Sequence, residues 1–179
     1  EVDSGDLVRF VIIAENTGDA NNGAFDITIR EDAIPAGYQI PTGGINLRVV
    51  NGAGDTLAVD NANPEADLFT TGITLTDNGT TGALTASSAT SGENIVIITY
   101  DLEVADIAEA SQEISSEAYL TNYTNVDNGV NFLTTDLSDD ATTTIAASQI
   151  SKDFVSGSEG AANESEVVIG EVVTYQVVI

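Results

Sequence analysis

The chain has 179 residues, enough for one ordinary domain or one large β-domain. Four basic residues against 29 acidic ones give a formal net charge of −25, which repels DNA, RNA and anionic membrane surfaces. The lack of cysteine and histidine excludes zinc fingers and Ser-His-Asp triads, so metal binding is left to oxygen ligands, which suit Ca²⁺ or Mg²⁺. No apolar run approaches the roughly 20 residues that cross a bilayer. We therefore expect no nucleic-acid partner and no membrane insertion.

Two segments, one near each end of the chain, have similar sequences. Residues 1–13 and 166–178 align without a gap, with Asp6 replaced by Glu171 and Phe10 by Tyr175. This internal repeat predicts one period of a tandem array followed by the first strands of the next copy. Because the chain starts at Glu1 inside an expected strand, we also expect it to be a processed product or part of something longer.

The repeat also predicts which face of this strand is buried. Apolar side chains are kept at alternate positions in both copies: Val8, Phe10 and Ile12 in the first, and Val173, Tyr175 and Val177 in the second. Arg9 and Val11 alternate with them and are replaced by polar residues in the second copy. Since neighbouring residues of a strand point to opposite faces, the first set is expected to face the core and the second to face outward.

Other strands follow along the chain, separated by Asn-Gly and Asp-Asn-Gly turns. In order, they are expected at 25–30, 45–49, 57–59, 73–75, 94–104, 116–123 and 141–146. Phe25, Ile27 and Ile29 share one face of the first of these. The segment 94–104 is the strongest and predicts a central strand, whereas 104–112 is the one place where we expect a helical turn. Many short strands with turns between them predict an all-β fold, a sandwich of two antiparallel sheets.

Several short motifs along the chain occur in a familiar order. They are Gly5-Asp6 with Val8 and Phe10, Asn16-Thr17-Gly18-Asp19, Ile27 with Ile29, Asp32 with Pro35-Ala36-Gly37, the 94–104 strand, Glu117 to Thr121, Asp139 to Thr142, and Ile150-Ser151-Lys152. This order resembles the repeat domains of large prokaryotic surface proteins, the isopeptide-forming fimbrial or "conserved repeat" domains, and it covers almost the whole chain. The resemblance implies an immunoglobulin-like sandwich, an extracellular or cell-surface location, tandem arrangement and a stalk or filament role rather than an enzyme.

The chain departs from that family at its first strand. In such domains a lysine-bearing strand precedes the Gly-Asp strand, yet Lys152 lies just upstream of the second copy of the repeat. We therefore expect residues 1–147 to form a β-sandwich repeat lacking its first strand, and residues 148–179 to be the opening strands of the next repeat or a donor segment. A sheet that lacks a strand is completed most simply by strand sharing with a neighbouring copy. The apolar residues expected to be shared are Val167, Ile169, Val173, Tyr175 and Val177.

Lys152 is the only lysine of the chain. The resemblance implies that a buried lysine could attack an Asn or Asp side chain to form an isopeptide bond. The candidate acceptors are Asn131, Asp136, Asp139 and Asp140. The alternative is a lysine at a strand edge that deters aggregation or pairs with one of the many carboxylates.

Acidic clusters suggest calcium as the candidate cofactor. Asp19 and Asn21, with Gly23 behind them, form a fragment of a calcium-loop pattern, although Arg30 stands where the bidentate glutamate would complete it. Asp136, Asp139 and Asp140 form a second candidate site, and Asp55 with Asp60 a third. The alternative is a solvated acidic surface with polar turns.

These observations together predict a structural protein. We expect a repeat or subunit of an extracellular filament, fimbria or surface stalk, assembled head-to-tail from copies of itself and stabilised by cations. The alternative is an adhesin or carbohydrate-binding module that contacts its ligand through loops at one end. Paired carboxylates alone are compatible with a glycosidase, but no pattern of an aromatic-lined cleft accompanies them, so we expect no enzymatic activity.

Overall fold

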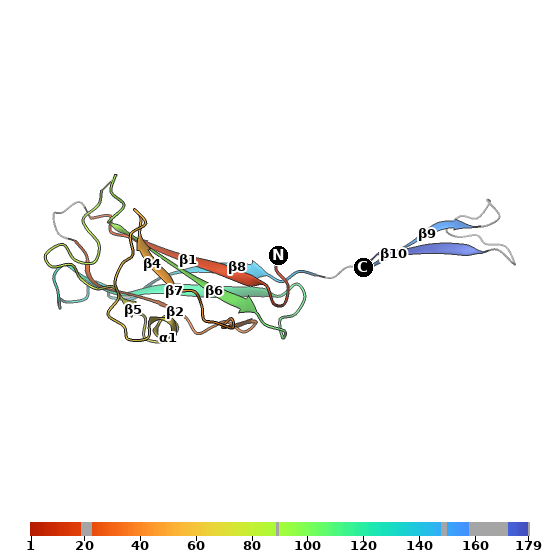
Figure 1. Ribbon diagram of the computed structural model, residues 1–179, viewed down its shortest axis with the longest axis horizontal. Helices are drawn as coiled ribbons and strands as arrows, with labels where there is room; N and C mark the ends of the chain where they lie inside the picture. Colours follow the sequence, from red (N-terminus) through yellow and green to blue (C-terminus); the bar gives the residue numbers. More distant parts are fainter. Residues whose placement is uncertain (19–22, 89, 148–149, 158–171, 179) are drawn as a thin grey trace. The chain divides into compact units, whose positions relative to one another are not determined.

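The computed structural model describes residues 1–18, 23–88, 90–147, 150–157 and 172–178. It divides into two compact units, Glu1–Ile145 and Ala146–Ile179. The first unit contains two antiparallel sheets, and the second contains one pair of strands (Figure 1). The expected all-β antiparallel sandwich is therefore confirmed.

The first sheet is built around β6 (Ile95–Val104), the long strand expected to be central. One edge of β6 pairs with β1 (Leu7–Glu15), and the other edge pairs with β4 (Arg48–Asn51) and, further along, with β3 (Tyr38–Gln39). Val96, Ile98, Tyr100, Leu102 and Val104 are fully buried. The inward side of β6 is thus continuous with the core along its whole length.

The second sheet has the strand order β5-β2-β7-β8, and all its pairs are antiparallel. Its strands are β5 (Ile73–Thr74), β2 (Phe25–Glu31), β7 (Glu113–Thr124) and β8 (Leu137–Thr144). The burial of β2 alternates strictly, with Phe25, Ile27 and Ile29 buried as the sequence predicted. Glu31 continues the same buried series.

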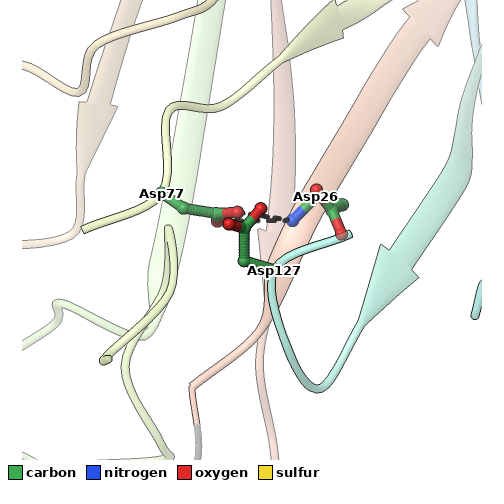
Figure 2. A group of neighbouring side chains, drawn as sticks. All are labelled: Asp26, Asp77 and Asp127. Atoms are coloured by element: carbon green, nitrogen blue, oxygen red, sulfur yellow. Dashed lines mark hydrogen bonds between the residues drawn. The ribbon is translucent and has the colours of Figure 1, made fainter. Parts of the chain in front are cut away.

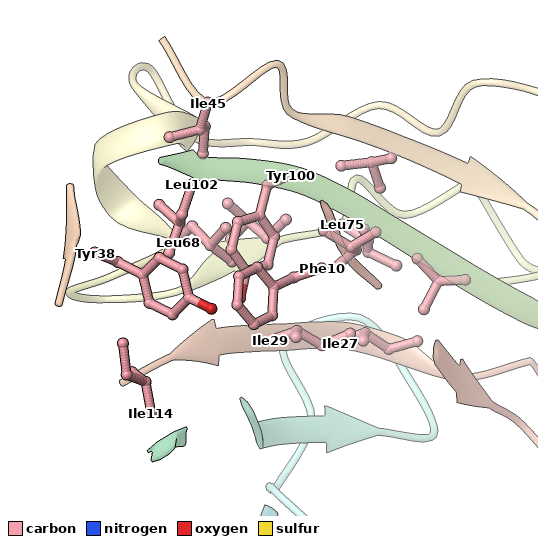
Figure 3. Packing of buried hydrophobic residues seen from close by; sticks show 14 of the residues in the cluster. Phe10, Ile27, Ile29, Tyr38, Ile45, Leu68, Leu75, Tyr100, Leu102 and Ile114 are labelled. Carbon is pink, nitrogen blue, oxygen red and sulfur yellow. The ribbon is translucent and has the colours of Figure 1, made fainter. Parts of the chain in front are cut away.

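The core lies between the two sheets and is rich in aromatic contacts (Figure 3). The rings of Phe10 and Tyr100 stack with centroids 5.3 Å apart, and Tyr38 meets Phe10 edge-on at 5.5 Å. Such pairs add to the stabilisation that burial of their area provides. Phe10 is buried while Arg9 and Val11 are exposed, which confirms the face of β1 that the repeat predicted.

The prediction for the single helical turn was wrong. Val104 ends β6 and residues 105–112 form turns and irregular backbone, whereas the helix of the described chain is α1 (Pro64–Asp67). Proline suits the first position of a helix because its fixed φ is helical and that position needs no N–H donor. Leu68, directly after the helix, is completely buried, so the turn anchors a surface segment to the core.

Several strands differ from the sequence prediction: β1 begins at Leu7 rather than at Glu1, β7 begins at Glu113 rather than at 116, and residues 57–59 form no strand but an isolated bridge from Val59 to Leu75. The strand expected at 45–49 begins at Arg48, because Asn46 takes a left-handed φ of 51° that interrupts extended backbone, although Ile45 is fully buried. The last strand of the unit, expected at 141–146, is β8 and starts at Leu137. After Leu137, its first half is polar, so apolar periodicity could not reveal it.

The second unit contains β9 (Ser151–Gly157) and β10 (Val173–Val178), which pair antiparallel with a bulge between Thr174 and Tyr175. Exposed apolar side chains are frequent in this unit, and they belong to Ile150, Val155, Val172, Tyr175, Val177 and Val178. An isolated pair of strands is marginally stable in water at best. The unit therefore has little core of its own among its described residues.

Candidate functional site

A groove lies between β1 and β8, the edge strands of the two sheets of the first unit. Two hollows follow each other along these strands, one lined by 8–13 of β1 and by Asp139 to Ala141 of β8, the other by 14–18 and Leu137. Side chains of β2 and β7 form the floor. We call this feature the β1–β8 groove.

The groove-facing edge of β1 has no strand partner among the described residues. Asn16 N–H donates to Asn94 O at 2.8 Å, and Val104 N–H donates to Asp6 O at 2.9 Å, so even-numbered residues of β1 bond to β6. In an antiparallel ladder the intervening residues direct their N–H and C=O groups to the opposite side. The odd-numbered residues 7–13 thus present backbone donors and acceptors on the side away from β6.

A row of three residues crosses the inner face of the second sheet beneath the groove. Glu31 of β2 pairs with Ala118 of β7, and Ala118 pairs with Asp139 of β8. All three line the same hollow, and residues paired in register point to the same face of a sheet. Two carboxylates therefore flank one small side chain on the side of the sheet that faces the groove.

Glu31 is the most buried of these acids, with 4% of its surface exposed. Its Oε1 accepts a hydrogen bond from the hydroxyl of Tyr100 at 2.5 Å, and its Oε2 accepts one from Ser116 Oγ at 3.1 Å. Burial raises the pKa of Glu31, and the two hydrogen bonds oppose that rise. Burial and the neighbouring Glu31 together raise the pKa of Tyr100. No cationic group among the described residues forms an ion pair with Glu31.

Lys152, the lysine of the isopeptide prediction, lies exposed on β9, and its Nζ sits 4.0 Å from the centre of the Tyr175 ring. Within its own unit it is therefore not in the desolvated setting that a lysine nucleophile requires. The isopeptide bond stays a prediction, because residues from outside this unit would have to bury Lys152.

The candidate acceptors are spread over β8 and the segment before it. Asn131 is exposed and donates to Thr121 O at 2.9 Å, and Asp136 is also exposed. Asp139 and Asp140 are adjacent in β8 and so point to opposite faces, with Asp140 accepting from Ser115 Oγ at 3.2 Å on the outer face. Of these acceptors, Asp139 is the one on the inner face.

Some predicted site residues lie outside the described part of the chain. They are the calcium candidates Asp19 and Asn21 and the strand-sharing candidates Val167 and Ile169. The other strand-sharing candidates, Val173, Tyr175 and Val177, belong to β10 and pair with β9. Of the third calcium candidate, Asp55 contacts Asn51, and Asp60 accepts from Thr76 Oγ1 at 2.6 Å.

Within the described residues, three other carboxylates gather: those of Asp26, Asp77 and Asp127 (Figure 2). One oxygen of each lies within 4.8 Å of the others. The backbone N–H of Asp26 donates to both oxygens of Asp77 at 3.3 Å, and burial raises the pKa of Asp77. Their oxygen atoms are of the type that Ca²⁺ takes as ligands. Sequence reasoning missed this cluster because its members come from three distant segments.

Sequence reasoning also missed Glu31. The usable signal was its position two residues after Ile29 in an alternating series, which places a carboxylate on the apolar face of β2. A charged residue on a core-facing position is uncommon unless a specific contact holds it.

Among the described residues, no helix has both the length and the apolar character required to span a membrane.

No protein-family model matches the chain, and no curated protein matches it. A solved structure described as "BspA_C_WT" is similar, with a TM-score of 0.42 and 14% sequence identity. The similarity covers 98% of this chain and 54% of that one, so the chain spans about half the length of the solved structure. A likeness of this degree carries no information about function.

Proposed function

We propose that the chain is a structural module of an extracellular filament or surface stalk, and that successive copies are joined by sharing β-strands. The observation that carries this proposal is the β1–β8 groove, with an unpaired backbone edge along one side. A row of free N–H and C=O groups is a template for an additional strand. Main-chain hydrogen bonds to an added strand supply affinity, and the side chains below the edge supply specificity.

The second unit supports the same proposal as a candidate donor of strands. Its strands are exposed, and it carries apolar side chains such as Val155 and Val177 at the surface. Exposed apolar residues on a pair of strands with little core favour association with another surface. One chain thus has both a groove that can accept a strand and exposed strands that can be donated to another copy.

A chain with one acceptor and one donor associates head-to-tail, and such an interface does not close on itself unless its rotation forms a ring. Sedimentation velocity of the purified chain tests this proposal, because head-to-tail association yields a series of species that grows with concentration. Negative-stain microscopy at high concentration should then show fibres. A single monomeric species at all concentrations would contradict strand sharing, and binding of such a monomer to a glycan array would support an adhesive module instead.

A further inference from the structure

We propose that the β1–β8 groove binds β9 of a second copy of this chain, in a register that places Lys152 of that copy between Glu31 and Asp139. This inference rests on the proposed function, strand sharing between copies, and adds to it the donated strand, its register and an ion-pair contact.

The register follows from the internal repeat and from the pairing of β9 with β10. In the second unit, Gln176 is opposite Asp153 and Val177 is opposite Lys152. The repeat aligns Gln176 with Val11 and Val177 with Ile12. If β9 pairs with β1 as it pairs with β10, Asp153 lies opposite Val11 and Lys152 lies opposite Ile12.

The edge of β1 that β9 would occupy is also determined. One edge of β1 is taken by β6, from Leu7↔Glu103 to Glu15↔Ile95. A strand that pairs with β1 in the folded unit must therefore lie on the other edge, which borders the groove. The odd-numbered residues of β1, including Val11, would then exchange backbone hydrogen bonds with it.

This register points Lys152 inward. Residues directly opposite each other in adjacent strands project to the same face, and Ile12 lies on the core-facing side of β1. β1 and β8 run in opposite directions along the groove, since residues 8–13 line one hollow with Asp139 to Thr143, and Ala14 lines the next with Leu137. Ile12 is therefore level with the part of β8 that carries Asp139.

Charge complementarity favours this occupant, because Arg9, Arg30 and Arg48 lie on strands that are already paired inside the first unit. Arg9 pairs with Asp101 at 2.7 Å, and Arg30 pairs with Asp32 at 3.7 Å. The ammonium group of Lys152 contacts the ring of Tyr175. Among the described residues, it forms no ion pair with a carboxylate. The groove offers the carboxylates of Glu31 and Asp139 on both sides of the small Ala118, which leaves room for an ammonium group. A buried carboxylate gains most from a cation that hydrogen-bonds to it.

Charge variants of the full chain test the ion pair by sedimentation velocity. Lys152→Glu should raise the concentration needed for association by at least about tenfold, because it places a third carboxylate beside two others. Lys152→Arg, which keeps the charge, and Arg48→Glu, which makes the same charge change on another strand, should associate like the unmodified chain. The double variant Lys152→Glu with Asp139→Lys should recover association. An unaffected Lys152→Glu, a Lys152→Arg that fails to associate, or no recovery in the folded double variant would overturn the ion pair.

Cysteine cross-linking tests the register directly, because the chain contains no cysteine. Val11→Cys and Asp153→Cys are made in separate chains, mixed and oxidised, and the proposed register predicts a disulfide-linked mixed dimer. Gln39→Cys, exposed on β3, replaces Val11→Cys as the matched control and should give little product. Association without the Val11–Asp153 link would overturn the register but leave strand sharing intact. A chain that does not associate at all would overturn the proposed function itself.

Discussion

The hydroxyl of Tyr100, on the central strand of one sheet, donates a 2.5 Å hydrogen bond to Glu31 on the other sheet. This bond joins the two layers of the sandwich inside a mainly apolar core. It also keeps a carboxylate in a place where its ionised form is poorly solvated, which has a measurable effect on stability.

Glu31→Gln should increase stability at neutral pH. Because burial raises the pKa of Glu31 in the folded state, its favourable contribution is complete below the unfolded-state pKa, near 4.5, and is lost as pH rises through the raised folded-state pKa. Glutamine keeps an acceptor for Tyr100 and does not titrate. Urea unfolding between pH 4 and pH 8, at concentrations where the chain is monomeric, should show a flatter profile for the variant. Equal slopes would contradict a raised pKa.

Asp101→Asn should have the opposite pH signature. Arg9 and Asn46 hydrogen-bond to the Asp101 carboxylate and lower its pKa to about 2. This stabilisation is present above the unfolded-state pKa of about 3.8 and is lost as pH falls towards 2. The variant should melt a few degrees lower at pH 7, and its melting temperature should fall less than that of the unmodified chain on acidification. Thermal unfolding followed by circular dichroism from pH 7 to pH 2 checks this.

Tyr38→Phe should stabilise the protein. The Tyr38 hydroxyl is buried and has no hydrogen-bond partner among the described groups, so it bears a desolvation cost without compensation. Its removal should raise the free energy of unfolding by about 1 kcal/mol, while the ring keeps its contact with Phe10. Tyr100→Phe is the matched control and should destabilise, because it removes the bond to Glu31. A Tyr38→Phe protein as unstable as Tyr100→Phe would show that the Tyr38 hydroxyl is satisfied.

Asp127→Asn should stabilise the chain when divalent cations are absent. Three carboxylates lie close together, and the charge of Asp127 adds to the burial that raises the pKa of Asp77. Relief of this repulsion should add up to about 1 kcal/mol at pH 7 in the presence of a chelator. Calcium titration in the same experiment tests the expectation of a calcium cofactor: a cation bound here would stabilise the unmodified chain more than the variant. Loss of stability in chelator would contradict the repulsion.

The sequence predicted most of the strands because their apolar residues alternate. The repeat added the orientation of β1, with Phe10 buried and Val11 exposed. Prediction failed where apolar periodicity is absent: in β8 polar residues follow Leu137, Asn46 interrupts a strand with a left-handed φ, and α1 is a single turn started by Pro64. A four-residue helix has too few residues for any period to emerge.

The candidate site could be predicted in part. The sequence indicated Lys152 and Asp139 as candidate site residues, but only the structure shows the surroundings of each. Glu31 became visible only when Tyr100 and Ser116, which are remote in the sequence, were placed against it. Contacts across the two sheets depend on strand order and register, which a single sequence does not specify.

The acidic residues on β8 have a further consequence for which strands can approach it. Asp139 and Asp140 lie on an edge strand of a chain whose net charge is −25, so a second acidic edge is repelled before backbone bonds can form. This repulsion is screened over about 10 Å at 0.1 M ionic strength and over about 3 Å at 1 M. Ionic strength should therefore set how selective the edge is: dilute buffer excludes mismatched edges most strongly, whereas concentrated brine relaxes that discrimination.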